Sequence, residues 1–159
     1  MSGADEISLL MSTVEQARTR RDQSALLLVG SGVSIQATDG AKAASWGGLL
    51  DLGITRCEEL AAERKLSDFD GGSARSKLAS KNVADVIDAA TLVEQRLRAA
   101  KGSVFRDFLR QSVGSLSPSA PAILHALKDL ELPLSTTNYD VLLETVLGVQ
   151  GMSWTSDGL

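Results

Sequence analysis

Two short stretches of the chain combine residue types that could do chemistry. In the first, LLLVGSGVS (residues 26–34), four apolar residues precede two glycines separated by one serine. Glycines at the end of a strand let backbone N–H groups approach a phosphate, and Ser34 could add a hydroxyl donor. The stretch has neither the third glycine of G-x-G-x-x-G, where Ile35 stands, nor the Lys-Ser or Lys-Thr pair of a P-loop. A tight turn that needs glycine for its backbone alone is the alternative.

The second stretch is STTNYDVLLE, residues 135–144, in which hydroxyl, amide and carboxylate side chains follow an apolar run. In open α/β sheets, ligands bind beyond the carboxyl ends of the strands. The alternative is helix capping by Asn138 or Asp140, with Thr136 and Thr137 as ordinary strand residues. Capping explains only one residue of the cluster, so we predict that the two stretches form one ligand site.

Hydrophobic periodicity predicts the elements that position these stretches. The apolar runs 25–29 and 132–136 predict strands, and the first fits a strand buried on both faces of a parallel sheet. Apolar residues at helical spacing predict helices over 5–21, 46–65, most of 74–116, about 120–130 and 141–147. Between the first strand and residue 46 the sequence predicts the glycine turn and a polar loop.

This order of elements predicts an α/β fold class: a Rossmann-like parallel sheet flanked by helices, with a helical insert over about 55–130. No linker divides the chain, so residues 1–159 form one domain. Two strands make a poor sheet, because sheets commonly have about 5–6 strands. We therefore expect the sequence to be the N-terminal part of a longer domain, truncated at its C-terminus.

Composition narrows the classes of function. The chain has 43% apolar and 23% charged residues, as soluble globular proteins do. A net charge of −4 argues against direct binding of nucleic acid. Neither a secretory signal nor an apolar run long enough to span a bilayer is visible, and the single cysteine cannot form an intramolecular disulfide. We expect a cytoplasmic protein that binds neither nucleic acid nor membrane.

The two stretches resemble motifs of one family. GSGVS resembles the G-A-G-[IV]-S phosphate turn of sirtuins, and TTNYD resembles their T-Q-N-x-D motif. The sequence is more similar still to the sirtuin-like NAD hydrolase (NADase) domains of prokaryotic anti-phage defence effectors. Those domains commonly read G-A-G-V-S, then a P-x-W-x-x-L-like segment, then T-T-N-Y-D-x-x-L-E. The counterparts are Gly30 to Ser34, with Ser31 in place of alanine, Ser45 to Leu50, and Thr136 to Glu144.

The resemblance implies roles for individual residues. The backbone of the glycine turn and the hydroxyl of Ser34 would hold the pyrophosphate of NAD, which is the substrate. Asn138 would be catalytic at the nicotinamide ribose, and Asp140 would support that pocket. The full cofactor-binding set implied in this way is Gly30, Ser31, Gly32, Val33, Ser34, Thr137, Asn138 and Asp140.

The missing cysteines separate two reactions of such proteins. Sirtuin deacylases carry a zinc module held by four cysteines, and Cys57 alone cannot build one. The resemblance therefore implies an NAD glycohydrolase that needs no metal and gives nicotinamide and ADP-ribose, linear or cyclic, as an effector of bacterial anti-phage defence. A homo-oligomer or a partner protein of the defence system is expected. The alternatives are a catalytically inactive NAD or nucleotide sensor, or a helical interaction module.

One part of the family pattern is missing. The histidine that family members place after the second motif, usually in an H-G pair, does not occur, and we expect it beyond Leu159. His125 precedes the second motif, where we expect a packing or surface role, and Trp46 is expected to be a packing anchor. Cys57 is expected to be a small buried hydrophobic residue. The chain as given is therefore expected to turn NAD over slowly or not at all.

Overall fold

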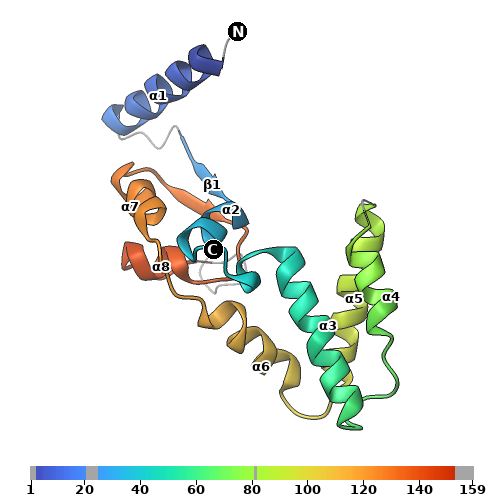
Figure 1. Cartoon of the computed structure of the whole chain (residues 1–159). Coiled ribbons are helices and arrows are strands. Elements are labelled where there is room, and N and C mark those ends of the chain that lie inside the picture. The colour runs from blue at the N-terminus through green and yellow to red at the C-terminus, as the bar shows by residue number, and fades with distance from the viewer. Residues whose placement is uncertain (1–2, 21–24, 81, 153–159) are drawn as a thin grey trace. The chain divides into compact units, whose positions relative to one another are not determined.

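The computed structural model describes residues 3–20, 25–80 and 82–152. Within these ranges the chain forms two compact units, which Figure 1 shows. One unit joins residues 1–39 to 118–159, and the other comprises residues 40–117. Arg21, the predicted end of the first helix, and Leu159, on which the expectation of truncation rests, lie outside the described residues.

Helices dominate both units. The first unit contains α1 (Gly3–Arg20), β1 (Leu27–Val29), α2 (Ser31–Ala37), α7 (Ala122–Asp129), β2 (Leu134–Thr136) and α8 (Leu142–Leu147). The second contains the 3-10 helix η1 (Lys42–Ala44), α3 (Trp46–Ala62), α4 (Gly71–Leu78), α5 (Val83–Ala99), α6 (Val104–Gln111) and the 3-10 helix η2 (Val113–Ser115). The helical stretch therefore begins earlier than the predicted insert over 55–130, and α7 belongs to the other unit.

The predicted fold class is wrong. Helix accounts for 65% of the structure, and the described residues contain only a two-stranded parallel sheet, not a Rossmann-like sheet flanked by helices. The prediction extrapolated from two apolar runs to a full sheet. The described chain between those runs instead carries apolar residues at helical spacing and forms helices. These helices pack against one another and add no strand to the sheet.

The two strands are short and half-buried. β1 pairs with β2 in parallel, with Leu27 opposite Leu134 and Val29 opposite Thr136. Val29 is buried, but Leu28 is 70% exposed, so the prediction that β1 is buried on both faces is also wrong. A continuous apolar run fits a strand buried on either one face or two, because the run does not specify how many layers cover it.

The unit of residues 40–117 is built around the packing of α3 against α4 and α5. Its buried core consists of Ile54, Cys57, Leu60, Ala74, Val93, Leu97 and Ala100. Three of its helices, α3, α4 and α5, are each preceded by a side chain that accepts a hydrogen bond from the backbone of the first turn: Ser45, Asp70 and Asn82. These caps satisfy N–H groups that have no partner inside the helix.

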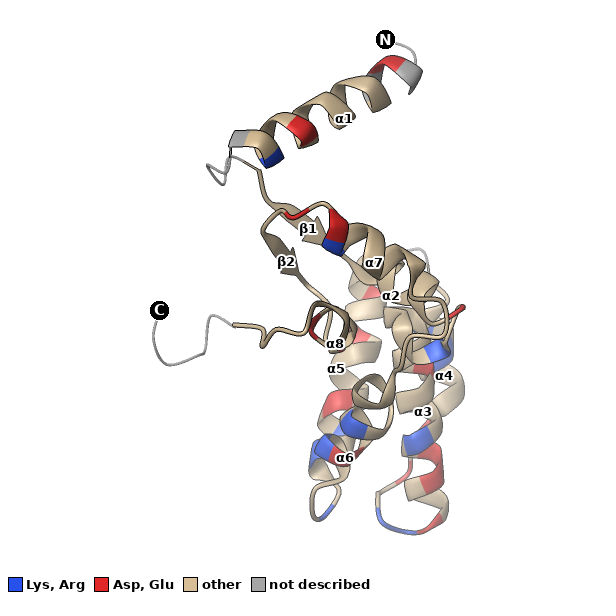
Figure 2. Ribbon diagram, turned by 90° about the vertical axis from the view of Figure 1, so that its left-hand side faces the viewer, with Lys and Arg blue, Asp and Glu red and all other residues tan. Residues whose placement is uncertain are grey.

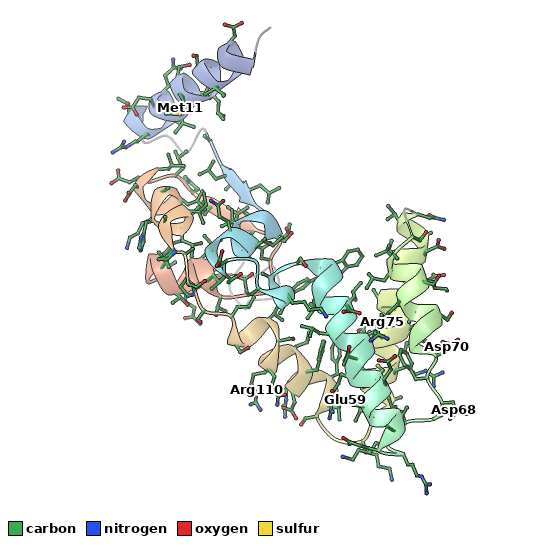
Figure 3. All side chains as sticks on the ribbon, in the orientation of Figure 1. Met11, Glu59, Asp68, Asp70, Arg75 and Arg110 are labelled. Carbon is green, nitrogen blue, oxygen red and sulfur yellow. The ribbon has the colours of Figure 1, made fainter. Side chains whose placement is uncertain are left out.

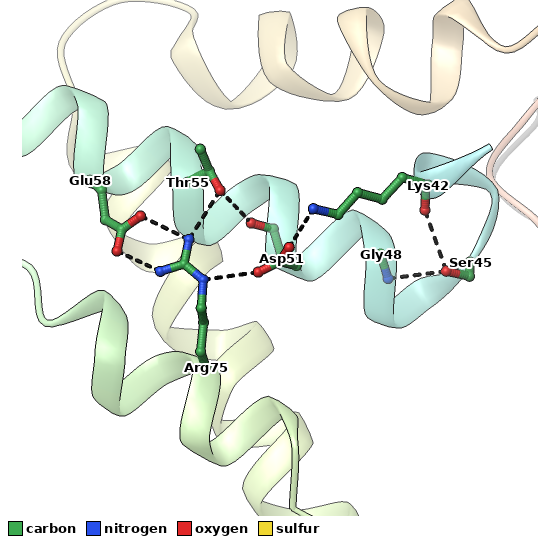
Figure 4. Close-up of polar contacts among 7 residues, drawn as sticks. All are labelled: Lys42, Ser45, Gly48, Asp51, Thr55, Glu58 and Arg75. Carbon is green, nitrogen blue, oxygen red and sulfur yellow. Dashed lines mark hydrogen bonds and ion pairs between the residues drawn. The ribbon is translucent and has the colours of Figure 1, made fainter.

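A cluster of charged side chains joins α3 to α4 (Figure 4). The guanidinium of Arg75 donates to Glu58 Oε2 at 2.8 Å and to Asp51 Oδ1 at 3.0 Å, and Lys42 also donates to Asp51. The hydrogen bond from Lys42 lowers the pKa of Asp51, and that from Arg75 lowers the pKa of Glu58. Figure 2 shows both acidic and basic residues along α3, whereas the charged residues of α4 are the basic Arg75 and Lys77.

The first helix contacts the rest of its unit mainly near its end. Ala17 is 6% exposed, and Arg18 lies 3.8 Å from Glu131. Met11, labelled in Figure 3, is 63% exposed on the preceding turns. Across the described residues, every helix is too short or too polar to cross a membrane.

Two glycines of α3 provide a test of the core packing. A Cβ on Gly53 would lie 2.6 Å from Val93 Cγ1 on α5, whereas a Cβ on Gly47 would meet no atom within 4 Å. Gly53→Ala should therefore lower the free energy of unfolding by about 1–3 kcal/mol through overpacking. Gly47→Ala should leave it unchanged or raise it by up to about 1 kcal/mol, because alanine favours helix. Urea denaturation of both variants measures the difference, and shifts of the same sign would contradict the close contact.

Candidate functional site

The parallel pairing of β1 with β2 brings the two motif stretches together. Both strands end at the same edge, and the carbonyl oxygen of Val29 accepts hydrogen bonds from the backbone N–H of Thr137 at 3.2 Å and from Thr136 Oγ1 at 3.1 Å. The polar residues after β2 therefore lie beside the glycines after β1. The predicted meeting of stretches about a hundred residues apart is present in the structure.

The glycine turn leads directly into a helix that the sequence analysis missed. Gly30 precedes α2, whose seven residues include Gly32, Val33 and Ser34. Glycines lower helix propensity, and this hid a helix that tertiary packing stabilises. α2 packs against α7, and the N–H of Ala120 donates to the carbonyl of Ala37 at 2.9 Å.

The hydroxyl of Ser34 is the centre of the polar cluster. Ser34 is 2% exposed and donates a hydrogen bond from Oγ to Asp140 Oδ2 at 2.6 Å. Its oxygen also accepts from Asn138 Nδ2 at 2.8 Å. Burial of a polar group is costly unless its hydrogen bonds are made, and here both the donor and an acceptor site of the hydroxyl are used.

Asn138 is held on both its backbone and its side chain. Its backbone N–H donates to Thr136 Oγ1 at 3.0 Å, a local contact of the kind that hydroxyl residues make two positions along the chain. Its side-chain Nδ2 donates to the Gly30 carbonyl at 3.1 Å in addition to Ser34. The amide predicted to act at the ribose is therefore fixed against the glycine turn.

Asp140 serves the cluster and the following helix at once. Oδ2 accepts from Ser34, and Oδ1 accepts from the backbone N–H of Leu142, the first residue of α8, at 3.1 Å. Helix capping, the alternative considered for Asp140, therefore accounts for the hydrogen bond of Oδ1 alone. Oδ2 instead accepts a hydrogen bond from Ser34, which lies on α2.

The glycines of the turn are not required by the backbone. Gly30 has φ −112° and ψ −176°, which any residue adopts, and a Cβ on Gly30 or Gly32 would meet no atom within 4 Å. By contrast, a Cβ on Gly48 would lie 2.0 Å from the Lys42 carbonyl, and Gly53 faces Val93. Glycine in a helix costs about 1 kcal/mol relative to alanine. A side chain at position 30 or 32 would therefore project into open space.

The remaining residues of the predicted set differ in their exposure. Ser31 and Thr137 are exposed, and Val33 is half-buried with its N–H donating to the Gly30 carbonyl at 3.1 Å. In the ranges that the structure describes, no group of three or more His, Cys, Asp or Glu side chains could hold a metal ion.

Three residues weighed for other roles lie elsewhere. His125 is exposed on α7. Trp46 is 48% exposed at the start of α3, in the other unit. Cys57 is fully buried in the core of the helical unit, as expected, and this burial raises the pKa of its thiol to about 11.

Thr136 is a site residue that sequence reasoning left out of the predicted set. Its hydroxyl links the end of β1 to the backbone of Asn138, so it orients the loop that carries the amide. The signal was present, because a threonine two residues before an asparagine favours this type of turn.

Comparison with protein-family models, with curated proteins and with solved structures finds no match to this chain.

The arrangement presents side-chain groups that can hydrogen-bond a polar ligand. The open glycine turn can accept an anionic or bulky group, and Asn138 offers a fixed amide beside it. The one carboxylate of the cluster, Asp140, already accepts a hydrogen bond on each oxygen. The residues therefore suit binding and orientation better than proton removal.

Filling the space above the turn should remove ligand binding without unfolding the protein. A Cβ on Gly32 meets nothing within 4 Å, so Gly32→Val should fold like the parent but obstruct the approach of a pyrophosphate. For NAD, the ligand expected from the sequence, isothermal titration calorimetry should show at least about a ten-fold loss of affinity, the equivalent of roughly 1.4 kcal/mol.

The matched control is Gly72→Val, which places the same side chain on an exposed glycine of α4 where a Cβ would lie 3.4 Å from Asp70 Oδ1. It should bind NAD as the parent does. A folded Gly32→Val protein with the parent's affinity would overturn the assignment of this turn to the phosphates.

Proposed function

We propose that this protein binds NAD and hydrolyses the bond between nicotinamide and ribose, giving nicotinamide and ADP-ribose. The observation that supports this most is that Asn138 is hydrogen-bonded to both Gly30 and Ser34. The two stretches that resemble sirtuin-like NADases thus form one cluster. The open space at Gly30 and Gly32 is consistent with a ligand at the turn.

The reaction asks little of the protein beyond positioning. The bond between ribose C1′ and the pyridinium nitrogen breaks, its electron pair neutralises the nicotinamide ring, and the ribose becomes oxocarbenium-like. A water oxygen then bonds to C1′ and releases a proton to solvent. In this proposal the glycine turn holds the pyrophosphate, and Asn138 holds the nicotinamide ribose over the route of the water. No metal takes part.

A second candidate is NAD binding without turnover, as in a sensor or pseudoenzyme. The observation in its favour is that Asp140 is occupied on both oxygens and that His125 lies exposed on α7. Asn138 itself is an amide and cannot act as a general base. Loss of a general base typically costs about 10²–10⁴ in rate, so hydrolysis by these residues alone would be slow.

The biological setting of the proposal rests on the resemblance. By this resemblance, the protein is a cytoplasmic effector of bacterial anti-phage defence. It would act with further copies of itself or with a partner protein of that system. Removal of NAD would then deprive an infected cell of its main hydride carrier.

Release of nicotinamide, followed by chromatography, tests the proposal. The parent chain should bind NAD and release nicotinamide slowly, and Asn138→Ala should weaken binding and abolish release, because the variant loses the amide that holds the ribose. His125→Ala is the control and should match the parent, since His125 is exposed on α7.

Each outcome has a consequence. Binding without release would favour the sensor, and absence of binding would reject both candidates and leave a helical interaction module. Robust turnover that disappears in His125→Ala would assign the base to the only histidine and contradict its surface role.

A further inference from the structure

One carboxylate oxygen of α8 is buried without a partner. Glu144 Oε2 is closed off from solvent and makes no hydrogen bond, and across the described residues no other side-chain atom is in this position. Burial removes water from a polar oxygen, so the lost hydrogen bonds must be replaced or the fold is destabilised. The proposed function gives Glu144 no task, although this residue ends the stretch STTNYDVLLE.

Glu144 lines a cavity of about 80 Å³. It is the only charged residue of the lining, and Leu134, Leu143, Leu147 and Val149 supply the apolar part. None of the lining residues belongs to the polar cluster beyond the ends of the strands. The cavity is therefore a feature separate from the candidate NAD site.

The size of the cavity limits what can occupy it. Pockets for drug-sized ligands have roughly 300–1,000 Å³, so this cavity of about 80 Å³ holds only a group the size of a side chain. Apart from Glu144 and Ser135, the lining residues carry no polar side chain. An ordered water needs about 2–4 polar partners, so this lining suits water poorly.

Charge selects among groups of this size. A carboxylate oxygen only accepts hydrogen bonds, and its strongest partners are cationic donors. The leucine and valine side chains favour an aliphatic stem behind the charge. A metal ion fits less well, because hard cations take several oxygen ligands and the described residues contain no group of three or more His, Cys, Asp or Glu that could hold one.

We propose that the cavity binds a primary ammonium group on a short aliphatic stem, with Glu144 Oε2 as its acceptor. Such a group is carried by a free alkylamine or by a lysine side chain of another protein, and the chemistry of recognition is the same for both. Binding supplies the hydrogen bond that the buried oxygen lacks, so it should also stabilise the fold.

The first probe is n-propylammonium chloride. In a titration followed by ¹H–¹⁵N NMR, it should shift the backbone amide signals of Leu134, Leu147 and Gly151 saturably. Its Kd should be in the millimolar range, because so small a ligand gains little binding free energy. 1-Propanol has the same number of non-hydrogen atoms but no charge, and it should bind at least about ten-fold more weakly. Equal affinities for the two probes, at matched ionic strength, would overturn the role of the carboxylate.

Glu144→Gln keeps the shape of the side chain and removes its charge. It should lower the affinity for n-propylammonium by at least about ten-fold. The control is Asp129→Asn, which removes an exposed carboxylate of α7 in the same unit and should leave the affinity unchanged. The parent's affinity in folded Glu144→Gln would contradict the proposal.

Glu144→Met tests the unpaired oxygen by thermal unfolding. Methionine has a similar length and favours helix, so removal of the buried oxygen should raise the midpoint of thermal unfolding by about 2–4 °C. n-Propylammonium should raise the midpoint of the parent but not that of this variant. A midpoint at or below the parent's would mean that the oxygen has a partner in the free protein, and the reason for a ligand would be lost.

A second probe distinguishes the two sources of the ammonium group. N-acetyl-lysine methylamide presents the side chain as a protein chain does. Saturable shifts of the same signals by both probes would assign the site to lysine side chains, and binding of n-propylammonium alone would assign it to free amines. Binding of neither probe would overturn the proposal, whereas the binding of NAD is decided independently by calorimetry.

Discussion

The candidate site depends on one buried hydroxyl. Ser34 joins a helix that follows β1 to a loop that follows β2, and its two strong hydrogen bonds cross 104 and 106 residues of sequence. A buried group of this kind is stabilising only when all its partners are present, so the strands, α2 and the start of α8 must be in place together. The arrangement couples the folding of the sheet edge to the geometry of the site.

The small size of the sheet makes this coupling more important. Two paired strands of three residues each bury little apolar surface, and Leu28 is exposed on one face. Side chains contribute what a larger sheet would supply through further strands: Thr136 bonds the end of β1, and Asn138 bonds the carbonyl of Gly30. The polar cluster thus holds the ends of the two strands together and is also the candidate binding site.

The structure distinguishes glycines that close packing requires from glycines that it does not require. At Gly48 and Gly53 a side chain would collide with a carbonyl or with Val93, so packing within the helical unit explains them. At Gly30 and Gly32 no collision and no left-handed backbone requires glycine. The sequence alone does not distinguish these cases, because it does not show which atoms a side chain at each position would meet.

The sequence by itself determined most of the local structure and the partnership of the two motifs. Apolar spacing located α1, α3, α7 and α8 to within a few residues, and the short runs 25–29 and 132–136 located the two strands. Tertiary structure alone decided the number of strands, the exposure of Leu28 and the presence of α2, since these depend on which layers cover an element. It also decided which way the Ser34 proton points, because hydrogen-bond direction is set by the partners that folding brings together.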